Sequence, residues 1–225
     1  MRPFLLLLAL HCSFAWGAPV PKPTDEEKLK IWGKVVDPTG DCKAGVIRDQ
    51  LVLSTPGGIR NPLDKILRVE REIEGDFEVQ VKMMHTTEPS HTAPKARTDA
   101  RILSGLFVGK SDSMLIAFGR QLRADEEKGR KYFDHSIWLE NHGAGTGSRI
   151  AGTKAFDEVF VRITRRGLKV SKAHSADGKE WHESAVARPD LPDRVHVGVY
   201  LWHDVDQPCE AVFERFRLTP LKAEK

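Results

Sequence analysis

Apolar residues in this chain recur with the two-residue period of a β-strand far more often than with the 3.6-residue period of an α-helix. Residues 77–82 are the clearest case, because three apolar residues beginning at Phe77 alternate with three polar residues beginning at Glu78. Successive side chains of a strand lie on opposite faces, so this segment predicts a strand with one buried and one solvated face. A helical turn is expected over residues 25–30, and almost all of the remaining structure is expected to be β.

Strand-like runs follow one another along most of the sequence. We expect about twelve strands, near residues 32–36, 46–54, 67–72, 77–84, 101–108, 114–122, 132–141, 159–165, 168–174, 181–186, 195–202 and 211–218. This many short strands predict an all-β sandwich of two antiparallel sheets. Asp177-Gly178 is the strongest hairpin signal, since Asp-Gly is a preferred pair in tight turns. Two long segments, 86–99 and 141–158, are expected to be loops.

The first eighteen residues have the pattern of a secretory signal peptide. Arg2 supplies a positive start, residues 4–10 form a short apolar core, and small residues precede the expected cleavage after Gly17. We therefore expect four parts: a signal peptide over 1–17, an extended leader over 18–30, one sandwich domain over 31–220 and a C-terminal tail over 221–225. A chain with such a leader is expected to be secreted or otherwise extracytoplasmic.

The charge balance excludes some classes of partner. The formal net charge is +3 at pH 7, from 35 basic and 32 acidic residues. A chain so near neutrality has no electrostatic basis for binding nucleic acid or an anionic membrane. After the signal peptide, no apolar run approaches the ~20 residues that a membrane-spanning helix needs. We expect neither a nucleic-acid partner nor a membrane span.

Five segments follow one another in an order that matches a known superfamily: GDFEVQVKM (75–83), SGLFVGKSD (104–112), VFVRITRRGLKVSKAHSADGKEW (159–181), VHVGVYL (195–201) and AVFERFRLTP (211–220). They resemble the secreted concanavalin A-like lectin and glucanase sandwiches, particularly bacterial members of unknown function. The resemblance covers residues 31–220 and implies a jelly roll of two curved antiparallel sheets, with a concave face that often holds a glycan. It implies the fold more than the activity, because one fold hosts many functions.

Two cysteines, Cys42 and Cys209, remain once the signal peptide and its Cys12 are removed. Two cysteines in an oxidising compartment favour one bridge, and no histidine motif beside either one indicates a thiol nucleophile. In jelly rolls the first and last strands commonly lie in the same sheet, so the two ends can meet. We predict a Cys42–Cys209 disulfide, with two free thiols as the alternative.

Residues 74–78 place three acids, Glu74, Asp76 and Glu78, at alternate positions. Retaining glucanases of this fold use a Glu-x-Asp-x-Glu strand, in which two carboxylates ~5–5.5 Å apart act as nucleophile and acid/base. Here Gly75-Asp76 has the pattern of a turn leading into the strand, which would remove Glu74 from the shared face. We therefore predict no catalytic residue.

Two expected loops carry groups that could ligate a metal ion. His203, Asp204 and Asp206 lie in one loop, and Asp37 and Asp41 lie in another. Calcium takes six or more oxygen ligands, and neither set is complete. The two mature cysteines are far apart, so there is no zinc pattern. We predict no metal site and no cofactor, although calcium would suit loops of this kind.

Aromatic residues at alternate strand positions give the candidate binding site. Trp138 and Glu140 share one face of their strand, and Tyr200 and Trp202 share one face of another. Sugars stack apolar C–H faces on aromatic rings, and polar neighbours bind their hydroxyls. The alternative is that these rings fill the core between the sheets. The predicted ligand-binding residues are Trp138, Glu140, Tyr200 and Trp202, with Arg101, Arg120 and His142 nearby.

Three functions remain open at this point. The first is a secreted carbohydrate-recognition or cell-envelope binding module without catalysis, whose partner is a glycan or polysaccharide. The second is a divergent glycoside hydrolase or polysaccharide lyase, which two carboxylates ~5–9 Å apart in a cleft would favour. The third is a structural or protein-interaction domain, which a flat polar face would favour. We favour the first, so catalysis is not expected.

Overall fold

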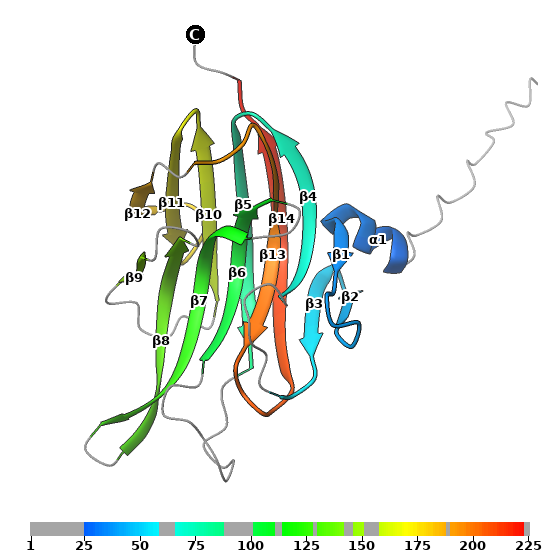
Figure 1. The fold of residues 1–225 in the computed structure, drawn as a ribbon, viewed down its shortest axis with the longest axis vertical. Helices are drawn as coiled ribbons and strands as arrows, with labels where there is room; N and C mark the ends of the chain where they lie inside the picture. Colours follow the sequence, from blue (N-terminus) through cyan, green and yellow to red (C-terminus); the bar gives the residue numbers. More distant parts are fainter. Residues whose placement is uncertain are drawn as a thin grey trace, which may run out of the picture.

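The computed structural model describes residues 25–58, 66–87, 101–110, 114–127, 130–141, 146–150, 158–187 and 190–222. In these residues one helix, α1 (Asp25–Trp32), precedes two seven-stranded antiparallel sheets (Figure 1). Sheet A contains, in spatial order, β1 (Lys34–Val36), β4 (Leu67–Glu74), β13 (Arg194–His203), β6 (Arg101–Gly109), β7 (Met114–Glu127), β8 (Arg130–Asn141) and β9 (Thr146–Ile150). Sheet B contains, in spatial order, β12 (His182–Ala187), β11 (Lys169–Ser175), β10 (Val159–Arg166), β5 (Phe77–Thr86), β14 (Cys209–Pro220), β3 (Gln50–Thr55) and β2 (Lys43–Ile47). The predicted all-β sandwich is confirmed.

The last two strands lie inside the sheets rather than at their edges. β13 pairs with β4 and β6 in sheet A, and β14 pairs with β3 and β5 in sheet B (Figure 1). The consecutive strands β4 and β5 belong to opposite sheets and are joined by a turn at Gly75 and Asp76. Gly75 has a φ of 74°, a conformation that glycine adopts at little cost.

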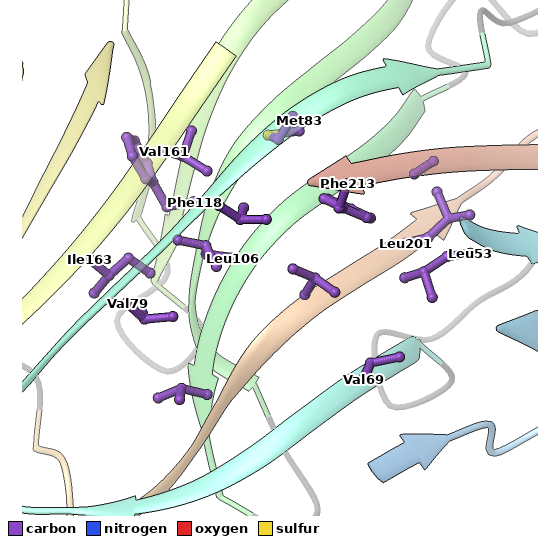
Figure 2. Packing of buried hydrophobic residues seen from close by; sticks show 14 of the residues in the cluster. Leu53, Val69, Val79, Met83, Leu106, Phe118, Val161, Ile163, Leu201 and Phe213 are labelled. Carbon is purple, nitrogen blue, oxygen red and sulfur yellow. The ribbon is translucent and has the colours of Figure 1, made fainter. Parts of the chain in front are cut away.

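The hydrophobic core fills the space between the two sheets (Figure 2). Its labelled members are Leu53, Val79, Met83, Val161, Ile163 and Phe213 from sheet B, and Val69, Leu106, Phe118 and Leu201 from sheet A. A hydrogen bond of 2.8 Å between the hydroxyls of Thr86 in β5 and Ser104 in β6 also joins the sheets. The outer face of sheet A, which this packing leaves outside the core, is the candidate ligand surface considered first.

Most expected strands are confirmed, and the differences have local causes. The expected strand over 46–54 is two strands, β2 and β3, because residues 48 and 49 form a tight turn. β9 lies inside the segment 141–158 that was expected to be a loop. Trp32 ends α1 instead of beginning a strand, and its ring packs 5.5 Å from that of Phe216.

The expected signal peptide over 1–17, most of the leader and the end of the tail lie outside the described residues. Helix α1 is short and polar, and the described residues contain no helix that could cross a membrane.

The predicted Cys42–Cys209 disulfide is wrong, because the structure joins neither cysteine to the other. The strands next to the two cysteines, β2 and β14, do belong to the same sheet B, but β3 lies between them. Cys209 pairs with Thr55 of β3, and Lys43, the neighbour of Cys42, pairs with Ser54 of the same strand. Strands lie ~4.8 Å apart, so two steps separate the cysteines by about 10 Å, beyond the ~7 Å reach of a disulfide.

The predicted hairpin around Asp177-Gly178 is confirmed between β11 and β12, but its connection is the six residues 176–181 rather than a tight two-residue turn. Oδ1 of Asp177 accepts hydrogen bonds from the backbone N–H groups of Lys179 and Glu180, at 2.8 and 3.0 Å. Oγ of Ser175 accepts a hydrogen bond from the N–H of Gly178 at 2.8 Å. The bonds to Asp177 also lower its pKa, and together these contacts fix the register of the hairpin.

The turn between β2 and β3 holds two residues in an unfavourable conformation. Arg48 and Asp49 have φ values of 52° and 69°, and a type I′ turn requires positive φ at both positions. Asn-Gly is preferred there, so we expect Arg48→Asn with Asp49→Gly to raise the free energy of unfolding by about 1 kcal/mol. Asp49→Gly also removes the exposed Lys28–Asp49 ion pair, but this pair contributes little to stability. Urea unfolding measures the change, and an equal gain in Arg48→Ala would contradict the explanation.

Candidate functional site

The outer face of sheet A, meaning the side that points away from the core, carries the candidate site. One row of paired residues crosses five strands: Arg68, Tyr200, Gly105, Gly119 and Trp138. The next row runs through Glu70, Gly198, Phe107, Ala117 and Glu140. Directly paired residues share a face of the sheet, so the register places the predicted positions 138, 140 and 200 on one side.

Glycine residues let the backbones of neighbouring strands approach closely in the middle of this face. A β-carbon added at Gly119 would lie 2.5 Å from Cα of Gly105, and one added at Gly105 would lie 2.6 Å from Cα of Gly119. A β-carbon at Gly198 would lie 2.9 Å from Cα of Glu70. The glycines therefore let the strands approach closely at the centre of the face, where they contribute no side chains of their own.

A buried group of charged side chains lies beside Gly198. Nε of Arg68 is 3.4 Å from Oε2 of Glu70, and Nδ1 of His196 is 3.2 Å from Oε1 of the same carboxylate. The Arg68 and Glu70 side chains are only 4% and 5% exposed. The guanidinium of Arg68 also lies 5.7 Å from the ring centre of Phe107. β13 separates the strands of these two residues, so Arg68 crosses β13 where Gly198 contributes no side chain.

The charged group continues towards solvent along β4 and β13. Nε2 of His196 lies 4.0 Å from Oε2 of Glu72, whose Oε1 lies 3.5 Å from Arg194. Arg194 also contacts Glu74 at 3.4 Å. Exposure rises from 5% at Glu70 through 22% at His196 to 64% at Arg194. Ion pairs at the exposed end contribute little to folding stability. At the buried end, removal of one charged partner would cost much more, because the other charge would stay buried without compensation.

A second apolar cluster lies on the same face, outside the main core. Its members are Ile66, Leu103, Phe107, Ala117, Tyr200 and Trp202. Tyr200 and Trp202 are 2% and 6% exposed, so neither ring is an open platform for stacking a sugar. The guanidinium of Arg101 lies 5.3 Å from the ring centre of Trp202, and Asp204 accepts a hydrogen bond from the N–H of Arg101. The two rings thus lie neither between the sheets nor in open solvent.

Nε1 of Trp202 and Oε2 of Glu70 are buried on this face and have no hydrogen-bond partner in the described part of the chain. The contact of that oxygen with Arg68 is an ion pair without hydrogen-bond geometry. Buried polar atoms are nearly always hydrogen-bonded, and an unsatisfied one costs about 1–3 kcal/mol. The indole N–H donates and a carboxylate oxygen accepts, so the face offers a donor and an acceptor to a ligand.

The remaining predicted site residues either lie on the inner face of sheet A or cannot be placed as side chains. Arg120 pairs with Ser104, whose hydroxyl is bonded to sheet B, so Arg120 lies on the inner face and is buried there. Arg120 therefore lies on the opposite side of sheet A from the predicted positions 138, 140 and 200. His142 lies outside the described residues, as do the side chains of Trp138 and Glu140.

Sequence reasoning missed Arg68 and Glu70, the most buried charged residues of the face. They alternate with apolar residues along β4, as the polar half of any solvated strand does. The signal that could have found them is Gly198, a glycine inside the otherwise bulky strand β13. A glycine in a strand interior often marks the close approach of another group.

Glu74 and Glu78 do not share one face of a single strand. Glu74 ends β4 in sheet A, whereas Glu78 lies in β5 of sheet B. Glu74 contacts Arg194, and Glu78 lies 3.8 Å from Arg162 on the neighbouring strand. The turn predicted at Gly75 separates the two carboxylates, as the sequence indicated.

The acidic loops use their carboxylates to hold their own backbones. Asp37, Asp41 and Cys42 gather their polar atoms within 4.8 Å of one another. The two oxygens of Asp37 accept hydrogen bonds from the N–H of Cys42 at 2.8 Å and from the hydroxyl of Thr39 at 2.9 Å. Burial raises the pKa of Asp37, but these hydrogen bonds outweigh it and lower the pKa. In the other loop, the carboxylate of Asp204 forms an ion pair with Arg101.

No protein family and no curated protein matches this sequence, but solved structures do. A protein of unknown function from Saccharomyces cerevisiae is 14% identical with a TM-score of 0.64, covering 87% of this chain and 99% of its own. The PL7 alginate lyase of Zobellia galactanivorans is 12% identical with a TM-score of 0.54, over 81% and 82%. A legume lectin-like domain from Entamoeba histolytica is 11% identical with a TM-score of 0.51, over 89% and 95%. This chain has their jelly-roll fold. At such identities the likeness concerns the fold alone.

Proposed function

We propose that this protein is a secreted module that binds a carbohydrate on the outer face of sheet A without catalysing its conversion. The unsatisfied donor and acceptor, Nε1 of Trp202 and Oε2 of Glu70, carry the proposal. A sugar hydroxyl both donates and accepts hydrogen bonds, so one class of ligand can satisfy both atoms. The fold adds support, because a legume lectin-like domain and an alginate lyase share it.

The geometry of the face suits a flat, hydroxylated ring. Gly105 and Gly119 contribute no side chains beside the buried cluster, and His196 and Arg101 supply polar groups at its margin. Because the two unsatisfied atoms are buried, a ligand reaches them only after a local rearrangement of the face. Association is therefore expected to be slower than for a preformed open site.

A variant that removes the indole N–H of Trp202 but keeps an aromatic ring tests whether this N–H binds the ligand. We expect Trp202→Phe to weaken glycan binding about tenfold, because the ring remains but the hydrogen bond is lost. Binding partners are first sought on an array of neutral and uronate-containing oligosaccharides, and calorimetry with the strongest binder then gives the affinity. The matched control is Trp181→Phe, since Trp181 packs against Phe160 of sheet B at 6.5 Å. Equal affinities for Trp202→Phe and the unmodified protein would refute the proposed site.

A second candidate function, a lyase or hydrolase acting at the same face, is favoured by the contact between His196 and Glu70. A carboxylate that holds Nδ1 leaves Nε2 as the proton-accepting nitrogen, the arrangement of a general base. Product release from the bound glycan separates the two functions. Turnover that disappears in His196→Gln while binding persists would make the protein an enzyme, and absence of turnover keeps it a binding module.

A further inference from the structure

We propose that His174 and His182 form a binding site for a divalent transition-metal ion on sheet B. The two residues are directly paired across β11 and β12, and their ring centroids lie 5.4 Å apart with planes tilted by 34°. Directly opposed residues on antiparallel strands have β-carbons ~4.5–5.5 Å apart and share a face. Two imidazoles at this spacing can each direct one nitrogen to a common ion at about 2.0–2.1 Å.

The chemistry of the pair selects the class of metal. A metal ion binds imidazole through the lone pair of an unprotonated ring nitrogen. Nitrogen ligands suit Zn²⁺, Cu²⁺ and Ni²⁺, whereas Ca²⁺ and Mg²⁺ prefer oxygen. Among the described residues, no third histidine, cysteine or carboxylate joins the pair. Two nitrogens are thus the ligands that the described residues supply to the ion.

The hairpin holds the two histidines in place before the metal arrives. Asp177, in the turn that links their strands, accepts hydrogen bonds from the N–H groups of Lys179 and Glu180 and so fixes the register that pairs His174 with His182. A site whose ligands are already positioned binds more tightly, because less conformational freedom is lost. Asp177 is thus a positioning residue, and its loss should weaken binding without removing a ligand.

The pair lies at the edge of sheet B, on the side of the sheet that carries the core residue Val161, and is separate from the proposed carbohydrate face. β12 is the outermost strand of sheet B, and His182 is exposed on it. The nearest charged residue on that strand, Glu183, lies 3.6 Å from Arg162 and is turned to the opposite face of the sheet. The site lies on a different sheet from Trp202 and Glu70, so either proposal can fail without the other.

The test is titration of untagged mature protein with Cu²⁺ or Ni²⁺, followed by calorimetry and, for copper, by electron paramagnetic resonance. We expect one ion per chain with two nitrogen ligands. His174→Gln and His182→Gln should each reduce affinity at least about tenfold and leave one nitrogen, and Asp177→Ala should reduce it by about tenfold with both nitrogens kept. Glu183→Gln, which alters the neighbouring carboxylate on the opposite face of β12, should bind as the unmodified protein does.

The electron paramagnetic resonance spectrum reports the number of nitrogen ligands on copper. This number does not depend on small differences in folding stability between the variants. Retention of two nitrogen ligands in either glutamine variant would overturn the proposal, because the ion would then be bound elsewhere. Absence of binding by the unmodified protein, or binding that depends on one histidine alone, would overturn it equally. Unchanged affinity in Asp177→Ala would remove the positioning role of the turn.

Discussion

Arg68→Leu is expected to lower the free energy of unfolding by about 3–5 kcal/mol, because the Glu70 carboxylate then stays buried without its cationic partner. The side chains of both residues are almost completely buried, and their charged atoms lie 3.4 Å apart. His196 contacts the other oxygen of the carboxylate, but it cannot replace a permanently charged guanidinium. Chemical denaturation monitored by tryptophan fluorescence measures the loss.

Arg194→Leu is the matched control, since it removes an arginine from the exposed end of the same charged group. Arg194 contacts Glu72 and Glu74 with more than half of each side chain exposed, so the expected cost is below about 1 kcal/mol. The double variant Arg68→Leu with Glu70→Leu should recover much of the lost stability, because no buried charge is left. Equal losses in Arg68→Leu and Arg194→Leu would show that burial does not set the cost.

Gly119→Ala is expected to destabilise the protein by on the order of 3 kcal/mol, although the substitution adds a single methyl group. That methyl would meet the backbone of β6, including Cα of Gly105 at 2.5 Å, and backbone cannot turn aside as a flexible side chain can. The β6–β7 pairing would have to open in the middle of sheet A. Thermal and urea unfolding report the loss, and ligand binding at the face should weaken as well.

Gly45→Ala provides the comparison, because it makes the same chemical change in strand β2 of sheet B. A β-carbon at Gly45 meets nothing within 4 Å. The substitution is expected to stabilise the protein by about 0.4–1 kcal/mol through reduced freedom of the unfolded chain. If Gly119→Ala were as harmless as Gly45→Ala, close strand approach could not be the reason for glycine on this face.

The strands could be predicted from the sequence wherever one face of the strand is buried and the other is exposed to solvent. Residues 77–82 show this, and β5 begins at Phe77 as expected. β9, with the sequence TGSRI, has no such alternation, and the turn at Arg48-Asp49 lacks the Asn or Gly that marks most tight turns. Pairing between strands that are distant in the chain produces no recognisable pattern in the local sequence. The position of β3 between β2 and β14, which excludes the disulfide, could therefore not be anticipated.

The candidate site could be predicted only in part, for a similar reason. Period two placed Tyr200 and Trp202 on one face of their strand, and the structure has them together in one cluster. Their burial and the burial of Arg68 and Glu70 depend on contacts between strands that are distant in the sequence. A single residue in β13, Gly198, makes room for that charged pair, and its meaning emerges only once β4 and β6 flank it.

The interior positions of β13 and β14 also determine when the chain can fold. Until residues 194–220 are available, β4 and β6 have no partner between them in sheet A, and β3 and β5 have none between them in sheet B. Both half-built sheets would present open edges during synthesis, and open edges invite pairing with other chains. Pairing over such sequence distances is also slow. A nascent chain of this protein thus has a long interval in which a chaperone or an export apparatus can engage it before either sheet closes.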